Sequence, residues 1–204
     1  MKKLMLGLVP LLAVAAFAAM PAMAAASTTE YGTGTTPFTK ATEVTSKGTT
    51  FKLIASGEEI ECKALSDTGT DENVSGVGKS TKETLTFSEC KINTGALKGC
   101  EVASTATTKT IVGAITNEVK SATEVEIKVT APGFAIVTTG SPAGCPKGTS
   151  VGTVEGHATG KQAAGSNVLV FSAATGLTLS GEAATITGED ATVTKTGSKP
   201  VVIV

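Results

Sequence analysis

The stretch Lys82–Ser104 constrains the fold more than any other, because it has the pattern of a disulfide-closed hairpin. Residues Thr84–Ile92 alternate in polarity and are rich in Thr, Leu, Phe and Ile, which is typical of a half-buried strand. With the turn at Asn93–Leu97, Cys90 would stand opposite Cys100, at a separation that a disulfide can bridge. The stretch therefore predicts architecture rather than activity.

The N-terminus has the features of a signal peptide. Lys2 and Lys3 are followed by an apolar run over Leu4–Ala19 and by the A-x-A site Ala22–Ala24, so we expect the mature chain to begin near Ala25. Cleavage two residues later is the alternative, and an uncleaved anchor fits the small-residue flank less well. We expect a secreted or envelope-associated protein with no membrane span in the mature chain, because no later run approaches the ~20 apolar residues that a spanning helix needs.

Composition restricts the partners. Removing Lys2 and Lys3 from the 17 basic residues leaves 15 lysines against 18 acidic residues, a net charge near −3. The chain has no arginine and no tryptophan, so it lacks the forked donors and stacking surfaces that nucleic-acid binding uses. We therefore expect no nucleic-acid partner. Abundant threonine, valine and glycine favour strands and turns.

All four cysteines are expected to form disulfides, because the predicted compartment is oxidising. Three pairings are possible. We favour Cys90–Cys100, which is local to the hairpin, and Cys62–Cys145, which then joins early and late parts of the domain. Metal ligation is the competing interpretation, but the chain has no C-x-x-C motif and no histidine near a cysteine.

The chain divides into three predicted parts: a signal peptide over 1–24, a Thr-rich linker over 25–49 and a β domain over 50–204. Regularly spaced strands and turn signals predict an all-β fold, an antiparallel β-sandwich or a partly closed barrel with two disulfides. A membrane barrel is disfavoured, because one tyrosine and no tryptophan cannot form aromatic girdles. The expected strands after the linker, besides the hairpin, include Thr50–Ala55, Glu58–Ala64, Lys109–Thr116, Glu124–Thr130, Phe134–Thr139, Val151–Ala158 and Asn167–Ser172. Gly113 marks a bulge or a close backbone approach.

The segment Asp67–Gly78 reads as a polar loop. Asp67, Asp71 and Asn73 offer the oxygen ligands that calcium prefers, but their spacing does not match an EF-hand. We interpret the segment as a solvated loop, and we expect neither a metal site nor a cofactor.

Catalysis by an imidazole would fall on His157, the one histidine of the chain. Glu155 shares its strand face and could orient it toward a serine. No G-x-S-x-G motif is present, and Ser150 and Ser166 are only neighbours in sequence. We interpret His157 as a surface residue of a strand.

Paired carboxylates could also catalyse glycoside hydrolysis, and two clusters offer them: Glu58, Glu59 and Glu61, and Glu189 with Asp190. A sugar cleft normally adds tryptophan or tyrosine surfaces, which this chain nearly lacks. We interpret both clusters as solvated charges, and we expect no catalytic residue and no enzyme.

The order of LTFSECK, GCEVAS and IVGAIT, followed by a lone cysteine before VGTVEG, resembles a group of small secreted β-rich proteins of Actinobacteria. The resemblance covers roughly Lys52–Phe171. It implies export and disulfides, but no activity and no site residues.

These observations predict an exported, non-enzymatic structural or adhesive protein of the cell envelope or extracellular space, with a cell-wall glycan or another envelope component as partner. The alternatives are a module that binds a carbohydrate or small ligand through loops at one end of the fold, and a polymer subunit that self-associates. In the polymer, Lys40–Ile54 or Pro200–Val204 would pair with the sheet edge of a neighbouring copy.

Overall fold

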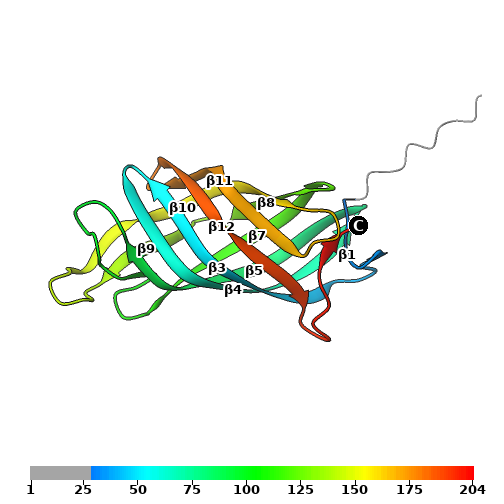
Figure 1. Ribbon diagram of the computed structural model, residues 1–204, viewed down its shortest axis with the longest axis horizontal. Coiled ribbons are helices and arrows are strands. Elements are labelled where there is room, and N and C mark those ends of the chain that lie inside the picture. The colour runs from blue at the N-terminus through cyan, green and yellow to red at the C-terminus, as the bar shows by residue number, and fades with distance from the viewer. Residues whose placement is uncertain (1–28) are drawn as a thin grey trace, which may run out of the picture.

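The computed structural model describes residues 29–204, which fold into β-strands joined by turns (Figure 1). The strands are β1 Tyr31–Thr33, β2 Thr36–Pro37, β3 Thr42–Ala55, β4 Glu58–Val74, β5 Val77–Ile92, β6 Val102–Ala103, β7 Thr110–Ser121, β8 Glu124–Val129, β9 Phe134–Thr139, β10 Lys147–Gln162, β11 Val168–Leu179, β12 Glu182–Thr194 and β13 Val202–Ile203. The all-β prediction is confirmed for these residues. Nowhere in 29–204 is there a helix with the length and hydropathy that crossing a membrane requires. The predicted signal peptide lies outside the described residues.

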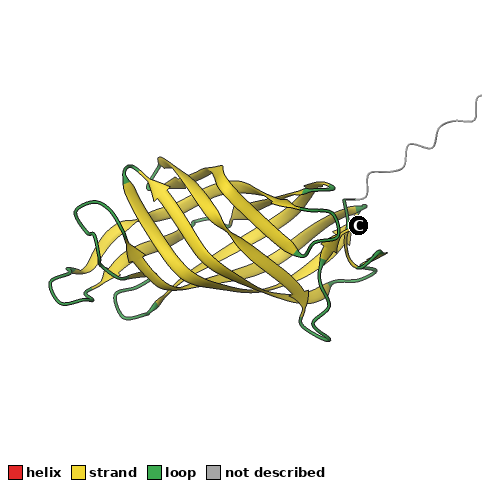
Figure 2. Cartoon of the chain, viewed as in Figure 1, coloured by secondary structure: helices red, strands yellow, loops and turns green. Residues whose placement is uncertain are grey.

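Eight strands close into one antiparallel barrel. Their order is β11-β12-β3-β4-β5-β7-β8-β10, and pairing between β10 and β11 completes the ring. Figure 2 shows these strands running at a tilt around an elongated body. Of the two predicted architectures the barrel is the one formed, and it is closed rather than partly open. Closure leaves none of these eight strands with an unpaired edge.

One end of the barrel wall is completed by shorter strands. β8 and β9 pair one after the other with the same edge of β10, at His157–Lys161 and at Lys147–Val154. β6 pairs with β9, and a bridge between Lys91 and Glu101 joins this segment to β5. These pairings extend the hydrogen-bonded wall from β10 through β9 and β6 to β5.

The opposite end is covered by a small sheet, which we call the cap: β2, β1 and β13, in the order β13-β1-β2. Figure 1 shows β1 and the C-terminus together at this end. Tyr31, Val201 and Ile203 of the cap region pack with Val44 and Val119 of the barrel in a small apolar cluster. The two ends of the described chain thus close one mouth of the barrel.

The main core fills the barrel from the other end. It consists of inward-facing Ile, Val, Leu and Phe side chains, with Phe51 and Phe87 in edge-to-face contact at 5.6 Å between ring centroids. Glycine makes room for the aromatic rings: a β-carbon on Gly113 would lie 2.5 Å from Cδ1 of Phe134. The close approach predicted at Gly113 is confirmed.

The structure corrects the predicted linker over 25–49. β3 already begins at Thr42 and pairs with β4 on one side and β12 on the other, and β1 and β2 belong to the cap. The inward positions of this part of β3 include Ser46 and Gly48, which are small or polar. This part of the sequence therefore lacks a regular alternation of apolar and polar residues, which would have indicated a strand. It was predicted to be a linker, although threonine favours strands.

The predicted loop over Asp67–Gly78 is also wrong. β4 continues to Val74 and β5 starts at Val77, and only a tight turn separates them. Ser75 and Gly76 both have positive φ, 54° and 78°, as a two-residue type I′ hairpin turn requires. Asp67 and Asp71 therefore lie on a barrel strand.

All four cysteines form disulfides, as predicted, but the pairing is Cys62–Cys90 and Cys100–Cys145, which corrects both predicted pairs. The hairpin after β5 exists, but Ile92 bonds to Cys100 through its backbone N–H, and Lys91 is bridged to Glu101. This register is shifted by two residues from the predicted one. Cys90 instead stands directly opposite Cys62 on β4, with 4.0 Å between their Cα atoms.

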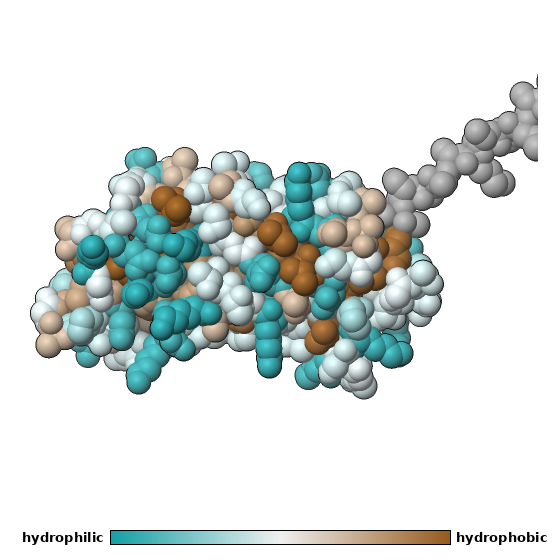
Figure 3. Space-filling model, viewed as in Figure 1, coloured by the Kyte–Doolittle hydropathy of each residue, from teal (hydrophilic) through white to brown (hydrophobic). Residues whose placement is uncertain are grey.

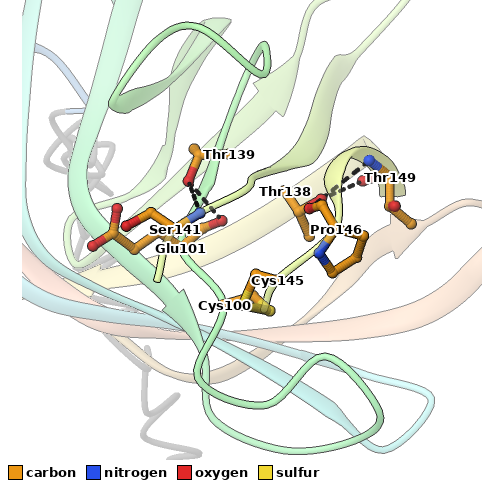
Figure 4. Close-up of a disulfide and its surroundings, with 8 residues drawn as sticks. All are labelled: Cys100, Glu101, Thr138, Thr139, Ser141, Cys145, Pro146 and Thr149. Atoms are coloured by element: carbon orange, nitrogen blue, oxygen red, sulfur yellow. Dashed lines mark hydrogen bonds between the residues drawn. A yellow bond between two sulfur atoms is a disulfide. The ribbon is translucent and has the colours of Figure 1, made fainter. Parts of the chain in front are cut away.

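The second disulfide fastens the loop before β10 to the segment before β6 (Figure 4). The hydroxyl of the fully buried Thr138 donates to the carbonyl of Pro146 at 2.6 Å and accepts from the backbone N–H of Thr149 at 3.1 Å. On the other side, the Glu101 N–H donates to the carbonyl of Ser141 at 2.8 Å. Hydrogen bonds thus anchor the chain on both sides of Cys145.

The outer surface is mainly polar. On the face in Figure 3, hydrophilic and neutral residues cover most of the barrel, and hydrophobic residues gather in separate small patches. The large apolar side chains that are exposed in the described chain are Ile54, Val74, Val112 and Val170. The apolar-in, polar-out alternation of the strands accounts for this distribution.

Candidate functional site

Four carboxyl groups face the inside of the barrel in the half that lies under the cap. Asp67 and Asp71 come from β4, Glu83 from β5 and Asp190 from β12, and their exposed fractions are 5%, 2%, 4% and 9%. We call these four residues the carboxyl cluster. This corrects two predictions. Asp67 and Asp71 were expected in a solvated loop and Asp190 as a solvated charge, but all three are buried.

Strand periodicity explains why these side chains point inward. On β5, Glu83 shares the face of Leu85 and Phe87, because alternate residues of a strand face the same side. On β4, Asp67 follows buried Leu65 by two residues. Gly69 stands opposite Glu83 in the register, and a β-carbon on Gly69 would collide with the Glu83 side chain. The missing side chain at Gly69 leaves the space that Glu83 occupies.

Neutral side chains hold two of the carboxyls. The Ser46 hydroxyl donates to Oδ2 of Asp190 at 2.7 Å. Nδ2 of Asn117 donates to Oε1 of Glu83 at 2.6 Å, and Oδ1 of the same amide accepts from the Tyr31 hydroxyl at 2.8 Å. The chain of bonds from Glu83 through Asn117 to Tyr31 connects the carboxyl cluster to the cap.

Three carboxyl oxygens in the cluster have no hydrogen-bond partner in the described chain: Oδ1 of Asp67, Oδ1 of Asp71 and Oδ1 of Asp190. An unpartnered polar atom that is buried destabilises a protein by about 1–3 kcal/mol. Native interiors contain few such atoms, so three within one cluster require an explanation.

Burial strongly perturbs the acidity of the cluster. Burial, and then the charges of Glu83 and Asp190, raise the pKa of Asp67 to about 8. Burial raises the pKa of Asp71 to about 7 and that of Asp190 to about 6. The pKa of Glu83 lies well above its usual value, because of burial and of its neighbour Asp71. Desolvation disfavours the charged form of an acid, so the cluster retains protons near neutral pH.

A cavity of about 50 Å³ adjoins the cluster. Its polar wall consists of the four carboxyls together with Tyr31, Asn117, Gln162 and Thr192. A second cavity of about 50 Å³ lies within the main core, and the surface of its wall is apolar. Six side chains belong to the walls of both cavities: Phe51, Leu85, Phe87, Ile115, Ile127 and Ile186. The barrel interior is thus polar toward the cap and apolar toward the disulfide Cys62–Cys90.

The carboxyl cluster does not have the geometry of a metal centre. Within residues 29–204, no three histidine, cysteine, aspartate or glutamate side chains are placed so that they could hold one metal ion. A perturbed acidic cluster beside a cavity is instead suited to holding protons or a positively charged group.

The residues considered for catalysis remain apart from this site. His157 is exposed on β10, opposite Lys128 of β8, as the surface interpretation predicted. Glu155 is exposed on the same strand, and Ser150 pairs with Val137 of β9. These residues form no triad in the described structure.

The two predicted carboxylate clusters differ in how far their side chains are buried. Glu59 and Glu61 form ion pairs with Lys52 at 2.9 and 3.2 Å, near the surface. The Asn93 amide and Lys52 lower the pKa of Glu59. Glu189 is exposed as predicted, but Asp190 points into the barrel, because successive residues of a strand face opposite sides.

A hollow of about 300 Å³ on the outside, near the shorter strands, is lined by Lys63, Glu89, Lys91, Glu101, Lys109 and neighbouring residues. Its charged side chains are exposed, and Lys63 and Glu89 already form an ion pair at 3.4 Å. The hollow therefore offers solvated charges of both signs rather than a set of converging groups.

Comparison of the chain with protein-family models, with curated proteins and with solved structures finds no match in any of the three.

Proposed function

We propose that this chain is an exported, non-enzymatic protein that binds a small ligand inside its barrel. The observation that carries the proposal is the set of three buried, unpartnered carboxyl oxygens beside one cavity. Sequence analysis placed the alternative ligand site on loops at one end of the fold. The barrel interior supports ligand binding better than those loops do.

A barrel whose interior served stability alone would be filled with apolar side chains. Burying carboxyl groups costs free energy unless they are paired. Groups that reduce stability and gather beside a cavity are typical of binding sites, where the ligand supplies the missing interactions. The carboxyl cluster has this character, and it lies next to an apolar cavity that could receive the rest of a ligand.

The proposed location outside the cytoplasm rests on two observations. Two disulfides join all four cysteines, and such bonds persist mainly in oxidising compartments. The N-terminal sequence has the signal-peptide pattern. Export is tested by expressing the full chain and determining the N-terminal residue of the secreted product, which is expected near Ala25.

Ligand binding is tested by thermal unfolding of the oxidised protein with panels of small sugars, alcohols, amines and inorganic cations. A ligand that binds the folded state at 100 times its Kd should stabilise the protein by about 2.7 kcal/mol. Glu83→Gln should abolish the stabilisation, whereas Glu189→Gln should preserve it, because Glu189 is exposed. If no compound in any panel stabilises the protein, the proposal is wrong.

A structural or adhesive role at the cell envelope is the second proposal. It is supported by the closed barrel, whose strands are paired and joined by two disulfides, so the fold presents a rigid polar surface. Co-sedimentation with purified cell-wall glycan tests it. A protein that stays in the supernatant at every glycan concentration would contradict this role.

A further inference from the structure

The interior of the barrel has an unbalanced set of charges. The buried ionisable side chains of the described chain are the carboxyl cluster and the Tyr31 hydroxyl. Every described lysine and His157 are at least partly exposed to solvent, so no basic side chain of the described residues is buried with the cluster. A positively charged ligand group would supply the charge that the protein itself does not place there.

The shape of the interior restricts the kind of cation. Carboxyls line one side of the polar cavity, whereas Phe51, Leu85 and Phe87 belong to its apolar wall and to the wall of the second cavity. A metal ion needs ligands on several sides, and the described chain provides no such group of three. A group that is charged at one end and apolar at the other matches both walls.

We propose, building on the ligand binding proposed above, that the ligand is a short alkylammonium ion. Its ammonium group lies among the carboxyls of the polar cavity, where unpartnered carboxyl oxygens are available to accept its hydrogen bonds. Its alkyl chain extends toward the apolar cavity.

The cavities limit the length of the chain. Each has a volume of about 50 Å³, and a single water occupies roughly 10–15 Å³ of such space. The two together accommodate a small amine but not a fatty one. The polar cavity lies beneath the cap, since Tyr31 and Val201 of that region line it.

Titration calorimetry with n-butylammonium chloride tests the ligand class, with n-butanol as an uncharged compound of nearly the same shape. The ammonium ion should bind at least tenfold more tightly than the alcohol. Asp67→Asn and Glu83→Gln should each weaken binding at least tenfold, and Glu189→Gln should leave it unchanged. n-Octylammonium should bind at least tenfold more weakly than n-butylammonium, because its chain exceeds the cavities.

A second readout is proton release. The ammonium charge stabilises ionised carboxylates, so binding at pH 7 should release protons, and the measured heat should depend on the ionisation heat of the buffer. The groups that face this position are the carboxyl cluster and the Tyr31 hydroxyl. A heat that is the same in phosphate and Tris buffers would contradict placement of the ammonium group among the carboxyls.

The outcomes separate the ligand class from ligand binding itself. If n-butanol or a sugar binds as tightly as the amine, the ligand is neutral, and the alkylammonium inference fails while ligand binding in the barrel stands. If K⁺ or Ca²⁺ binds and the amine does not, the ligand is an inorganic cation, with the same consequence. If no probe binds, both proposals fail.

Discussion

The carboxyl groups of Asp71 and Glu83 lie next to each other inside the barrel, on the neighbouring strands β4 and β5. Two buried acids in such contact share a proton, because both cannot be ionised at small cost. Burial raises the pKa of both groups, so the pair retains a proton near neutral pH. This pair makes the stability of the barrel dependent on pH.

We expect the free energy of unfolding to fall as the pH rises from about 4 to about 8. The folded-state pKa values are raised, to about 8 for Asp67, about 7 for Asp71 and about 6 for Asp190. The unfolded chain therefore loses protons first, and each carboxyl that stays protonated only in the folded state reduces stability by about 1.4 kcal/mol per pH unit. Urea unfolding at several pH values measures this effect.

Below about pH 4 the same carboxyls are protonated in both states, so their contribution should no longer change there. Asp67→Asn should make the free energy of unfolding fall less steeply with pH, because an amide does not ionise. Glu189→Gln is the control and should leave the slope unchanged. A stability that rises between pH 5 and pH 8 would contradict the buried positions of these acids.

Peptide mapping of the non-reduced protein should find Cys62 linked to Cys90 and Cys100 linked to Cys145. The two bonds close loops with sequence separations of 28 and 45 residues. Each bond restricts the unfolded chain, so replacing the two cysteines of a pair by alanine should lower the free energy of unfolding. The expected losses are about 3.5 kcal/mol for the first pair and about 4 kcal/mol for the second. Peptides that join Cys90 to Cys100 would contradict the observed register.

Tyr31→Phe should reduce the free energy of unfolding by about 1–2 kcal/mol. The substitution removes the hydroxyl that donates to Oδ1 of Asn117 at 2.8 Å, and it leaves that partly buried amide oxygen without its partner. Chemical denaturation measures the loss. Tyr31→Phe in an Asn117→Ala background is the control, and there the same change should cost clearly less.

Gly113→Ala should destabilise the protein by about 1–3 kcal/mol, because the new β-carbon would lie 2.5 Å from the ring of Phe134. Phe134→Leu makes space at the same contact. The double variant should therefore lose less free energy of unfolding than the two single variants lose together. Fully additive losses would show that the ring does not pack on Gly113.

The oxidised protein is expected to remain a monomer over a wide concentration range. Lys40–Ile54 largely coincides with β3, which pairs on both sides, and β13 pairs with β1 of the same chain. Strand exchange would require these pairings to open. Size-exclusion chromatography with light scattering measures the mass, and a mass that grows with concentration would instead favour the self-associating subunit.

The sequence by itself determined the local features of the fold. Alternating polarity predicted the strand at Glu124–Thr130, and the turn signal at Pro132 and Gly133 predicted a further strand at Phe134–Thr139. The positions of β8 and β9 confirm both. Parity also placed Glu83 on the face of Leu85 and Phe87, a signal that was available in the sequence and was not used to find the carboxyl cluster. Such features depend on neighbours along the chain, so a short window contains them.

Only the tertiary structure decided which residues meet across the barrel. A shift of two residues in one hairpin separated Cys90 from Cys100, and the register of β4 against β5 placed Cys90 opposite Cys62. Aspartate and glycine made Asp67–Gly78 look like a loop, yet barrel closure buried Asp67 and Asp71 beside Asp190, which lies more than a hundred residues away in sequence. Contacts of this kind depend on register and closure, which are set by all the strands together rather than by any one segment.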